Sequence, residues 1–190
     1  MSGASPATAR DGATISMTRL AVNVVAFQAG WFACVLGAAR GLPWAGTALA
    51  AVVVGAHVVS ARRPGRELKL VALALSAGVV WDSGLAASGW LKFASGSVIE
   101  GSAPHWILAM WALFATTLNV SMNWLKGRLP LAAALGAVAG PLSYWAGARL
   151  GAVVIVDAVA AYGALAVVWG VMMPVLMAAA RRFDGMRAAD

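Results

Sequence analysis

The stretch LAVNVVAFQAGWFACVLGAA at residues 20–39 carries no charge and is bounded by Arg19 and Arg40. An α-helix needs about 20 predominantly apolar residues to cross the hydrocarbon core of a bilayer. Only helices and closed barrels cross a bilayer, because backbone groups find no water there. The stretch therefore predicts a membrane-spanning helix.

The same pattern recurs along the rest of the chain. Further runs of about that length lie between charged residues, at 41–61, 70–91, 101–125, 129–148 and 158–180. The only charge inside any of them is Asp82. Barrel strands would alternate apolar and polar residues, and these Ala- and Leu-rich runs do not. The sequence predicts an all-α, polytopic integral membrane protein with six transmembrane helices in one bundle.

The charges outside these runs predict the domain boundaries and the orientation. Residues 1–17 are expected to be a disordered tail, residues 18–181 the transmembrane domain, and residues 182–190 a cytoplasmic tail. Short cytoplasmic loops carry an excess of Lys and Arg. With the N-terminus inside, 11 of the 14 Lys and Arg residues fall on the cytoplasmic side and Arg40, Lys92 and Arg149 outside. Both termini are therefore predicted to be cytoplasmic.

The first apolar run has an alternative interpretation as a cleaved signal peptide. The small residues at 37–39 resemble a peptidase site. Its length, together with Asn23 and Gln28 inside it, favours a retained helix instead.

Composition excludes several classes of protein. The chain is 62% hydrophobic and 11% charged, whereas soluble domains average about 45–50% apolar and about 25% charged residues. One cysteine, Cys34, cannot form an internal disulfide or a cysteine-rich metal site. The basic residues are too dispersed for a nucleic-acid patch. His57 and His105 lie toward opposite faces and cannot share a haem iron, so no cofactor and no metal are predicted.

Asp82 is the sharpest candidate for function. At 1.5 Å per residue it lies about 14 Å from the outer end of its span. An ionised carboxylate at that depth costs about 2.5–3.5 kcal/mol, so it usually faces the bundle or a cavity. The polar and aromatic residues expected in the outer half of the membrane complete a candidate outer-half cavity: Gln28, Trp31, Trp111, Tyr144, Arg149 and Tyr162. Asp82 is expected either to bond Ser83, Tyr144 or Tyr162, or to pair with Arg149, which has Asp157 as its other candidate partner.

Two further sets of residues stand out in the spans. A candidate inner polar cluster comprises Asn23, His57, Asn119 and Asn123. Its interpretations are hydrogen bonding between helices or a ligand site facing the cytoplasm. A seam of small residues is formed by Gly136, Gly140, Ser143 and Gly147. Such seams let backbones approach closely, so this one is expected to pack against a helix, a membrane-protein partner or a second copy of the chain.

Three motifs carry a family resemblance. They are N-x3-F-Q-x-G-W-F-A-C-V-L-G-A-A at 23–39, P-H-W-x3-M-W-x-L-F-A-T-T-L-N-x-S-x-N-W-L at 104–125, and G-P-L-S-Y-W-A-G-A-R-L-G-A at 140–152. With them the chain resembles a family of small bacterial inner-membrane proteins known only as a domain of unknown function. The resemblance implies a multi-pass protein of the bacterial inner membrane, and genes for cyclopropane-fatty-acid-synthase-like methyltransferases nearby. It carries no catalytic residues.

Three hypotheses about function follow. The first is an accessory or lipid-handling protein in membrane lipid or fatty-acyl modification, with membrane lipids as its partners. The second is a small-solute or proton-linked transporter that uses Asp82. The third is a structural subunit of a membrane complex. The residues do not decide whether the chain is an enzyme.

Overall fold

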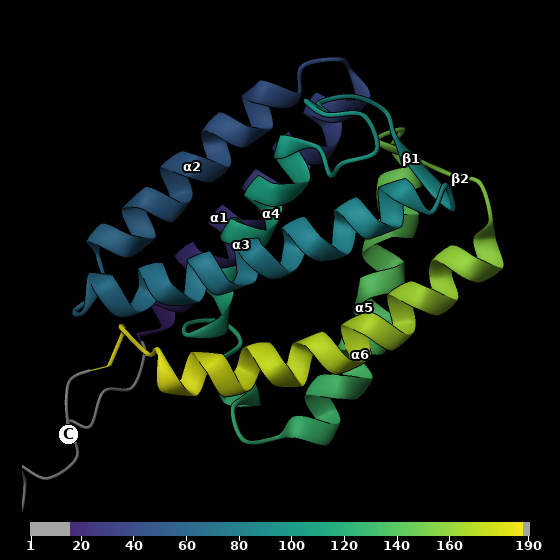
Figure 1. Ribbon diagram of the computed structural model, residues 1–190. Helices are drawn as coiled ribbons and strands as arrows, with labels where there is room; N and C mark the ends of the chain where they lie inside the picture. Colours follow the sequence, from purple (N-terminus) through teal and green to yellow (C-terminus); the bar gives the residue numbers. More distant parts are fainter. Residues whose placement is uncertain (1–15, 188–190) are drawn as a thin grey trace, which may run out of the picture.

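Six α-helices form the fold of the computed structural model, which describes residues 16–187 (Figure 1). In chain order they are α1 (Met17–Ala39), α2 (Pro43–Val59), α3 (Pro64–Ala87), α4 (His105–Leu118), α5 (Leu129–Arg149) and α6 (Ala158–Arg182). This order confirms the prediction of an all-α chain with six helices. The predicted tail at residues 1–17 lies almost entirely outside the described residues.

Local sequence explains where the helices begin. Proline stands in the first turn of α2, α3 and α5, where the missing N–H group would have no helical partner anyway. Asp157 caps α6, because its Oδ1 accepts a hydrogen bond of 3.0 Å from the backbone N–H of Ala160. The helix starts therefore follow from residues that are visible in the sequence.

Four of the helices, α1, α3, α5 and α6, are long and apolar enough to cross a membrane. The other two are apolar but shorter, with 17 residues in α2 and 14 in α4. At 1.5 Å per residue they extend about 26 Å and about 21 Å, against a hydrocarbon core of about 30 Å. The four long helices indicate a membrane protein, whereas six full-length spans are not confirmed.

The largest difference from the predicted spans is in the run 101–125, of which only residues 105–118 form α4. Pro104 precedes the helix in an extended conformation. At the other end, the hydroxyls of Thr116 and Thr117 donate to the carbonyls of Leu113 and Phe114, both at 2.7 Å. A short 3₁₀ helix, η1 (Asn123–Leu125), follows. Uncharged sequence thus continues past both ends of the helix.

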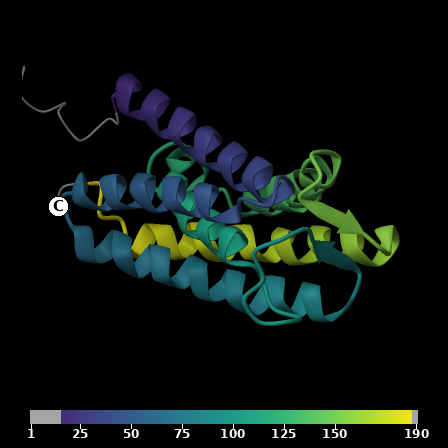
Figure 2. The same cartoon turned by 90° about the horizontal axis from the view of Figure 1, so that it is seen from above.

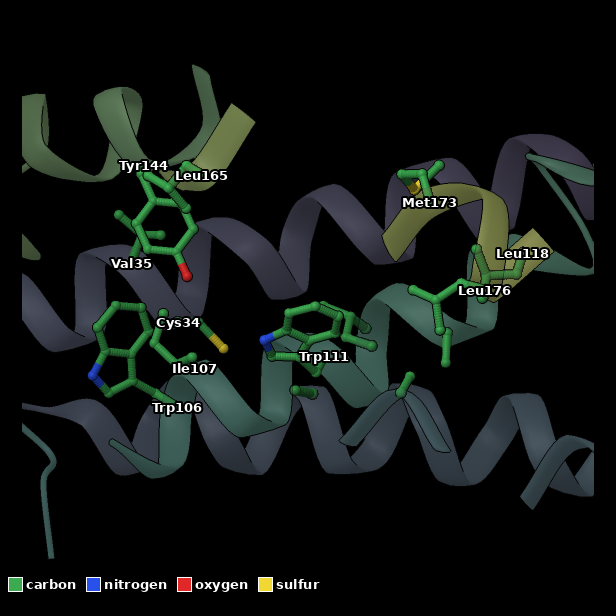
Figure 3. Close-up of a cluster of buried hydrophobic side chains, with 14 of the residues drawn as sticks. Cys34, Val35, Trp106, Ile107, Trp111, Leu118, Tyr144, Leu165, Met173 and Leu176 are labelled. Atoms are coloured by element: carbon green, nitrogen blue, oxygen red, sulfur yellow. The ribbon is translucent and has the colours of Figure 1, made fainter. Parts of the chain in front are cut away.

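Helix α4 is the centre of the bundle. It packs against α1, α2 and α3 and touches α6, whereas α5 packs chiefly on α6. Figure 2 shows α1 on one side of the bundle and α3 on the other. The α4 tryptophans Trp106 and Trp111 are 0% and 4% exposed and lie in the core that Figure 3 displays. Their burial follows from the position of α4, which has other helices on most sides.

The two ends of the bundle collect different loops. At one end the short strands β1 (Leu91–Phe93) and β2 (Val153–Ile155) pair antiparallel and tie the α3–α4 and α5–α6 connections together (Figure 1). The Ser95 hydroxyl also donates to the Ala38 carbonyl at 2.8 Å, which brings the α1–α2 connection there. At the opposite end, the Arg63 N–H donates to the Gly185 carbonyl at 3.0 Å. The structure thus gathers the loops into the two groups that the charges predict, and the membrane face of each group stays a prediction.

The small-residue seam of α5 is used inside the chain. A Cβ at Gly136 would overlap the backbone oxygen of Trp169 on α6, and a Cβ at Gly140 would overlap the ring of the same residue. Ser143 accepts a hydrogen bond of 3.3 Å from the ring N–H of Trp31 on α1. Three of the four seam residues thus pack against other helices of the same chain, and a partner or a second copy at the seam stays a prediction.

Candidate functional site

Asp82 lies on the buried stripe of α3 and is 0% exposed. Its Oδ2 accepts a hydrogen bond of 2.6 Å from the ring N–H of Trp111 on α4. Its Oδ1 accepts a short hydrogen bond from the Tyr144 hydroxyl on α5. In Figure 3 the Trp111 ring nitrogen and the Tyr144 hydroxyl face the same interior region. The carboxylate therefore joins three helices that are distant in sequence.

A glycine on α3 makes room for this arrangement. Gly78 lies four residues before Asp82 on the same face of the helix, and a Cβ there would overlap the Trp111 ring. Trp111 in turn stacks on Trp169 of α6, with ring centroids 4.8 Å apart and an interplanar angle of 13°. The indole is thus held between α3 and α6 with its N–H on Asp82.

Arg149 takes no part in this network. Among the described residues, no ion pair joins Arg149 to Asp82 or to Asp157. The predicted ion pair is therefore wrong, because Arg149 is exposed whereas Asp82 is buried with Trp111 and Tyr144, and Asp157 instead caps α6. The expected contact between Tyr144 and Asp82 is confirmed. Neither Tyr162 nor Ser83 forms a hydrogen bond with Asp82 within residues 16–187.

An apolar groove opens between α1 and α5, beside the Asp82 network. Its main cavity has a volume of about 550 Å³, and its walls come from α1, α4, α5, α6 and the turn after α4. Gln28 and Trp31 line it, as predicted for the candidate cavity. Leu135 and Leu142 also line it and are 37% and 55% exposed. Because these leucines are exposed, the groove opens on the outer surface of the bundle.

A smaller chamber connects this groove to the Asp82 donors. It has a volume of about 70 Å³, and both Trp111 and Tyr144 line it. It shares five wall residues with the main cavity: Phe27, Trp31, Phe114, Ser143 and Trp169. The two hydrogen-bond donors to the buried carboxylate therefore form the inner wall of a space that leads to the surface of the bundle.

The inner polar cluster has Glu67 as its central residue. Glu67 is 0% exposed, and its Oε2 lies 2.9 Å from His57 Nε2. Its Oε1 accepts hydrogen bonds from the Asn119 side chain at 2.7 Å and from the Gly185 N–H at 2.8 Å. The predicted residues His57 and Asn119 are thus brought together by an acid that the sequence analysis did not select.

The other two predicted members of this cluster lie apart from Glu67. Asn23 donates to the Thr116 carbonyl at 3.1 Å and accepts from the Ser121 N–H at 3.3 Å, so it fastens α1 to the end of α4. The Asn123 side-chain oxygen is buried and has no hydrogen-bond partner among the described residues. The four predicted residues therefore do not form a single site.

A repeat in the sequence could have identified Glu67. The buried residues of α3 recur at three- and four-residue steps: Glu67, Leu70, Ala74, Gly78, Asp82 and Leu85. Residues at such spacings share one helix face. A predicted helix that begins at Pro64, rather than after Lys69, has this repeat and places both Glu67 and Asp82 toward the core.

The segment after α6 closes this end of the bundle. Lys126 Nζ lies 2.7 Å from Asp184 Oδ2, and Met186 is 5% exposed. Burial by itself would raise the pKa of Asp184, but the hydrogen bond from Lys126 and those from two backbone N–H groups hold it below its ordinary value. Burial lowers the pKa of Lys126, and Asp184 only partly offsets that shift.

This shift predicts an acid-sensitive closure. A carboxylate whose pKa is lower in the folded state stabilises that state above its ordinary pKa of about 3.9 and loses the contribution as the pH falls through the folded value. Hydrogen-exchange protection of residues 183–187, corrected for the intrinsic rate, should therefore fall below about pH 4. In Asp184→Asn the protection should be weaker at pH 7 and should lack the acid-induced loss that Asp184 causes. An identical acid-induced loss in that variant would contradict the assignment to Asp184.

Within residues 16–187 no group of three or more His, Cys, Asp and Glu residues is placed to hold a metal ion. The candidate site of the described residues is built from hydrogen-bonding groups and apolar surface. It consists of the Asp82 network beside an apolar groove, and of Glu67 with its donors at the opposite end of α3.

Comparison with known proteins gives a family without an assigned activity. No curated protein and no solved structure matches the chain. The family described as "Protein of unknown function (DUF2878)" matches residues 20–175, which include all six helices except the ends of α1 and α6. Because the match covers most of its length, the chain belongs to the DUF2878 family.

Proposed function

We propose that this protein is a lipid-handling component of a bacterial inner membrane and that it holds a fatty-acyl chain in the groove between α1 and α5. The proposal also places the N-terminus and the C-terminus of the protein in the cytoplasm. The observation that carries the proposal is the 550 Å³ groove, which leads to the donors of the Asp82 network.

The character of the groove favours an acyl chain over a polar solute. Ligand cavities commonly measure about 300–1,000 Å³, and this one is lined largely by apolar residues. Its mouth has exposed Leu135 and Leu142 on either side of Ala139. In a membrane such leucines face hydrocarbon, so an acyl chain can enter sideways without leaving an apolar medium.

Polar groups of the groove lie together on its inner wall, beside the small chamber. Trp111 and Tyr144 both donate to Asp82, and Ser143 and the Trp31 ring N–H bond each other nearby. Polar groups in an apolar cavity orient a ligand rather than add much affinity. The proposal therefore puts the acyl chain in the main cavity and the ester or carboxyl end of the lipid toward the small chamber.

Photolabelling tests the groove directly. The purified protein is placed in phosphatidylcholine vesicles in which some lipids carry a diazirine in one acyl chain, and the labelled peptides are mapped by mass spectrometry. Labelling should concentrate on residues 27–31 and 135–143. Ala139→Phe should lower that labelling severalfold, because its ring fills the mouth and takes the space that the acyl chain would occupy.

Ala134→Phe is the matched control, because Ala134 is an exposed residue of the same helix that lines none of the cavities described above. It should leave the labelling unchanged. Equal labelling of the wild type, Ala139→Phe and Ala134→Phe proteins would show general contact with lipid and would overturn the proposal.

Asp82→Asn separates the proposal from the transporter hypothesis. Asparagine keeps the shape and can still bond both Trp111 and Tyr144, so labelling of the groove should persist. Under the proposal, proton flux into vesicles that contain the protein does not depend on residue 82. A wild-type proton flux that Asp82→Asn abolishes would favour a proton-linked transporter instead.

A further inference from the structure

A second apolar cavity lies on the other side of the bundle, between α2 and α3. It measures about 430 Å³, and Ala109 and Ala112 of α4 form its floor. Thr47 is the one polar residue among those that line it. Val59 and Leu68, at its end nearest the α2–α3 loop, are 82% and 53% exposed. The cavity is therefore an apolar groove that opens along the face of the bundle, separate from the α1–α5 groove.

The length of this groove matches one leaflet of a bilayer. From Thr47 to Val59 α2 advances twelve residues, which is about 18 Å at 1.5 Å per residue. Half of a hydrocarbon core is about 15 Å. The groove is thus about as long as one leaflet of the hydrocarbon core is thick.

Positive charge gathers where the groove ends. Arg62, Arg63, Arg66 and Lys69 fall within eight residues, and three of them are exposed while Arg63 is half-buried. The one acid in this stretch, Glu67, points inward and is bonded by His57, Asn119 and Gly185. None of the four basic residues forms an ion pair with any residue in the described range 16–187. Their charge is therefore available to an anion at the mouth of the groove.

We propose that the α2–α3 groove binds an anionic glycerophospholipid, with one acyl chain along α2 and the headgroup phosphate on Arg62, Arg66 and Lys69. An apolar channel of leaflet depth that ends in uncompensated positive charge complements both halves of such a lipid. Juxtamembrane basic side chains attract anionic lipids in this way. An anionic lipid is favoured over an apolar partner helix, because such a helix would leave the four basic residues at the end of the groove without an anion.

Native mass spectrometry of the detergent-solubilised protein tests the site. The protein is titrated with phosphatidylglycerol or with phosphatidylcholine, and the affinity for the first bound lipid is measured from the fraction of protein that carries it. The wild type should bind one phosphatidylglycerol more tightly than phosphatidylcholine. Arg62→Gln combined with Arg66→Gln should weaken phosphatidylglycerol binding about thirtyfold. Arg181→Gln combined with Arg182→Gln removes two exposed charges at the same end of the bundle and should change it less than about threefold.

A second pair of variants tests the groove itself. Gly55 lines the groove and has open space at its Cβ position, so Gly55→Leu should occupy the acyl channel and weaken phosphatidylglycerol binding at least about tenfold. Gly163 on α6 also has open space at its Cβ position but lies outside the groove, so Gly163→Leu should leave binding unchanged. If Gly55→Leu unfolds at a lower temperature than Gly163→Leu, Ala51→Leu fills the same groove in its place.

Three results would overturn the proposal. Equal affinity of the wild type for phosphatidylglycerol and phosphatidylcholine would show that the site does not select an anionic headgroup. If the Arg62/Arg66 and Arg181/Arg182 double variants weaken phosphatidylglycerol binding equally, the effect comes from general surface charge. Equal binding by all groove-filling variants and by Gly163→Leu would show that the lipid does not enter the α2–α3 groove.

Discussion

Replacing Glu67 with alanine is expected to lower the free energy of unfolding by about 3 kcal/mol or more. The Glu67 carboxylate is 0% exposed and is contacted by His57, Asn119 and the Gly185 N–H. Each buried donor left without an acceptor costs about 1–3 kcal/mol. Alanine leaves all three groups without this acceptor at the end of α3, where the segment after α6 also packs. Unfolding in detergent, followed by circular dichroism, measures the loss.

Glu67→Gln is the control for this prediction. Glutamine keeps one oxygen for Asn119 and Gly185 and offers an N–H group to a neutral His57. We expect it to retain most of the stability that alanine removes. If Glu67→Ala proves as stable as the wild type, the hydrogen bonds of Glu67 do not hold this end of the bundle together.

The second large effect is expected from a single added methyl group, in Gly46→Ala. α1 and α2 approach so closely at this point that a Cβ on Gly46 would overlap the backbone of Cys34 and the carbonyl oxygen of Ala33. Backbone atoms inside a helix cannot turn aside as a side chain can. Overpacking of this kind costs about 1–3 kcal/mol and occasionally more. The midpoint of thermal unfolding should fall accordingly.

The same substitution at Gly55 should have the opposite sign. Gly55 lies in the same helix, and its Cβ position is open. Alanine favours a helix over glycine by about 1 kcal/mol, so Gly55→Ala should leave stability unchanged or raise it. Similar losses in Gly46→Ala and Gly55→Ala would mean that the close approach of α1 and α2 does not limit residue 46.

The candidate outer site was only partly predictable. Depth along the helix put Asp82, Trp111 and Tyr144 in the same half of the membrane, and the structure joins them by hydrogen bonds. The same reasoning placed Arg149 beside Asp82, and there it was wrong. Depth is one coordinate, and the rotation of each helix about its axis decides which side chains of a layer meet. Two neutral donors on α4 and α5 meet the carboxylate where an ion pair was expected.

Residue patterns predicted two wall residues of the groove between α1 and α5, but not its position between those two helices. Gln28 and Trp31 were assigned to a cavity because of their depth, and they do line one. That cavity exists because α5 packs on α6 through Gly136 and Gly140 rather than closing on α1. Which neighbour a small-residue seam selects depends on the fit of two complete surfaces.

By itself the sequence determined the number, the order and most of the ends of the helices. Charged residues and prolines interrupt the apolar runs, and the free N–H groups of a helix start tolerate proline there. Only the tertiary structure decided that α4 is short and central, that Glu67 gathers His57 and Asn119, and that Asp82 bonds Trp111 and Tyr144. Helix formation depends on neighbours within a few residues, whereas these hydrogen bonds join residues 10 to 62 positions apart. Packing therefore sets them, through the fit of side chains across helices that local sequence does not encode.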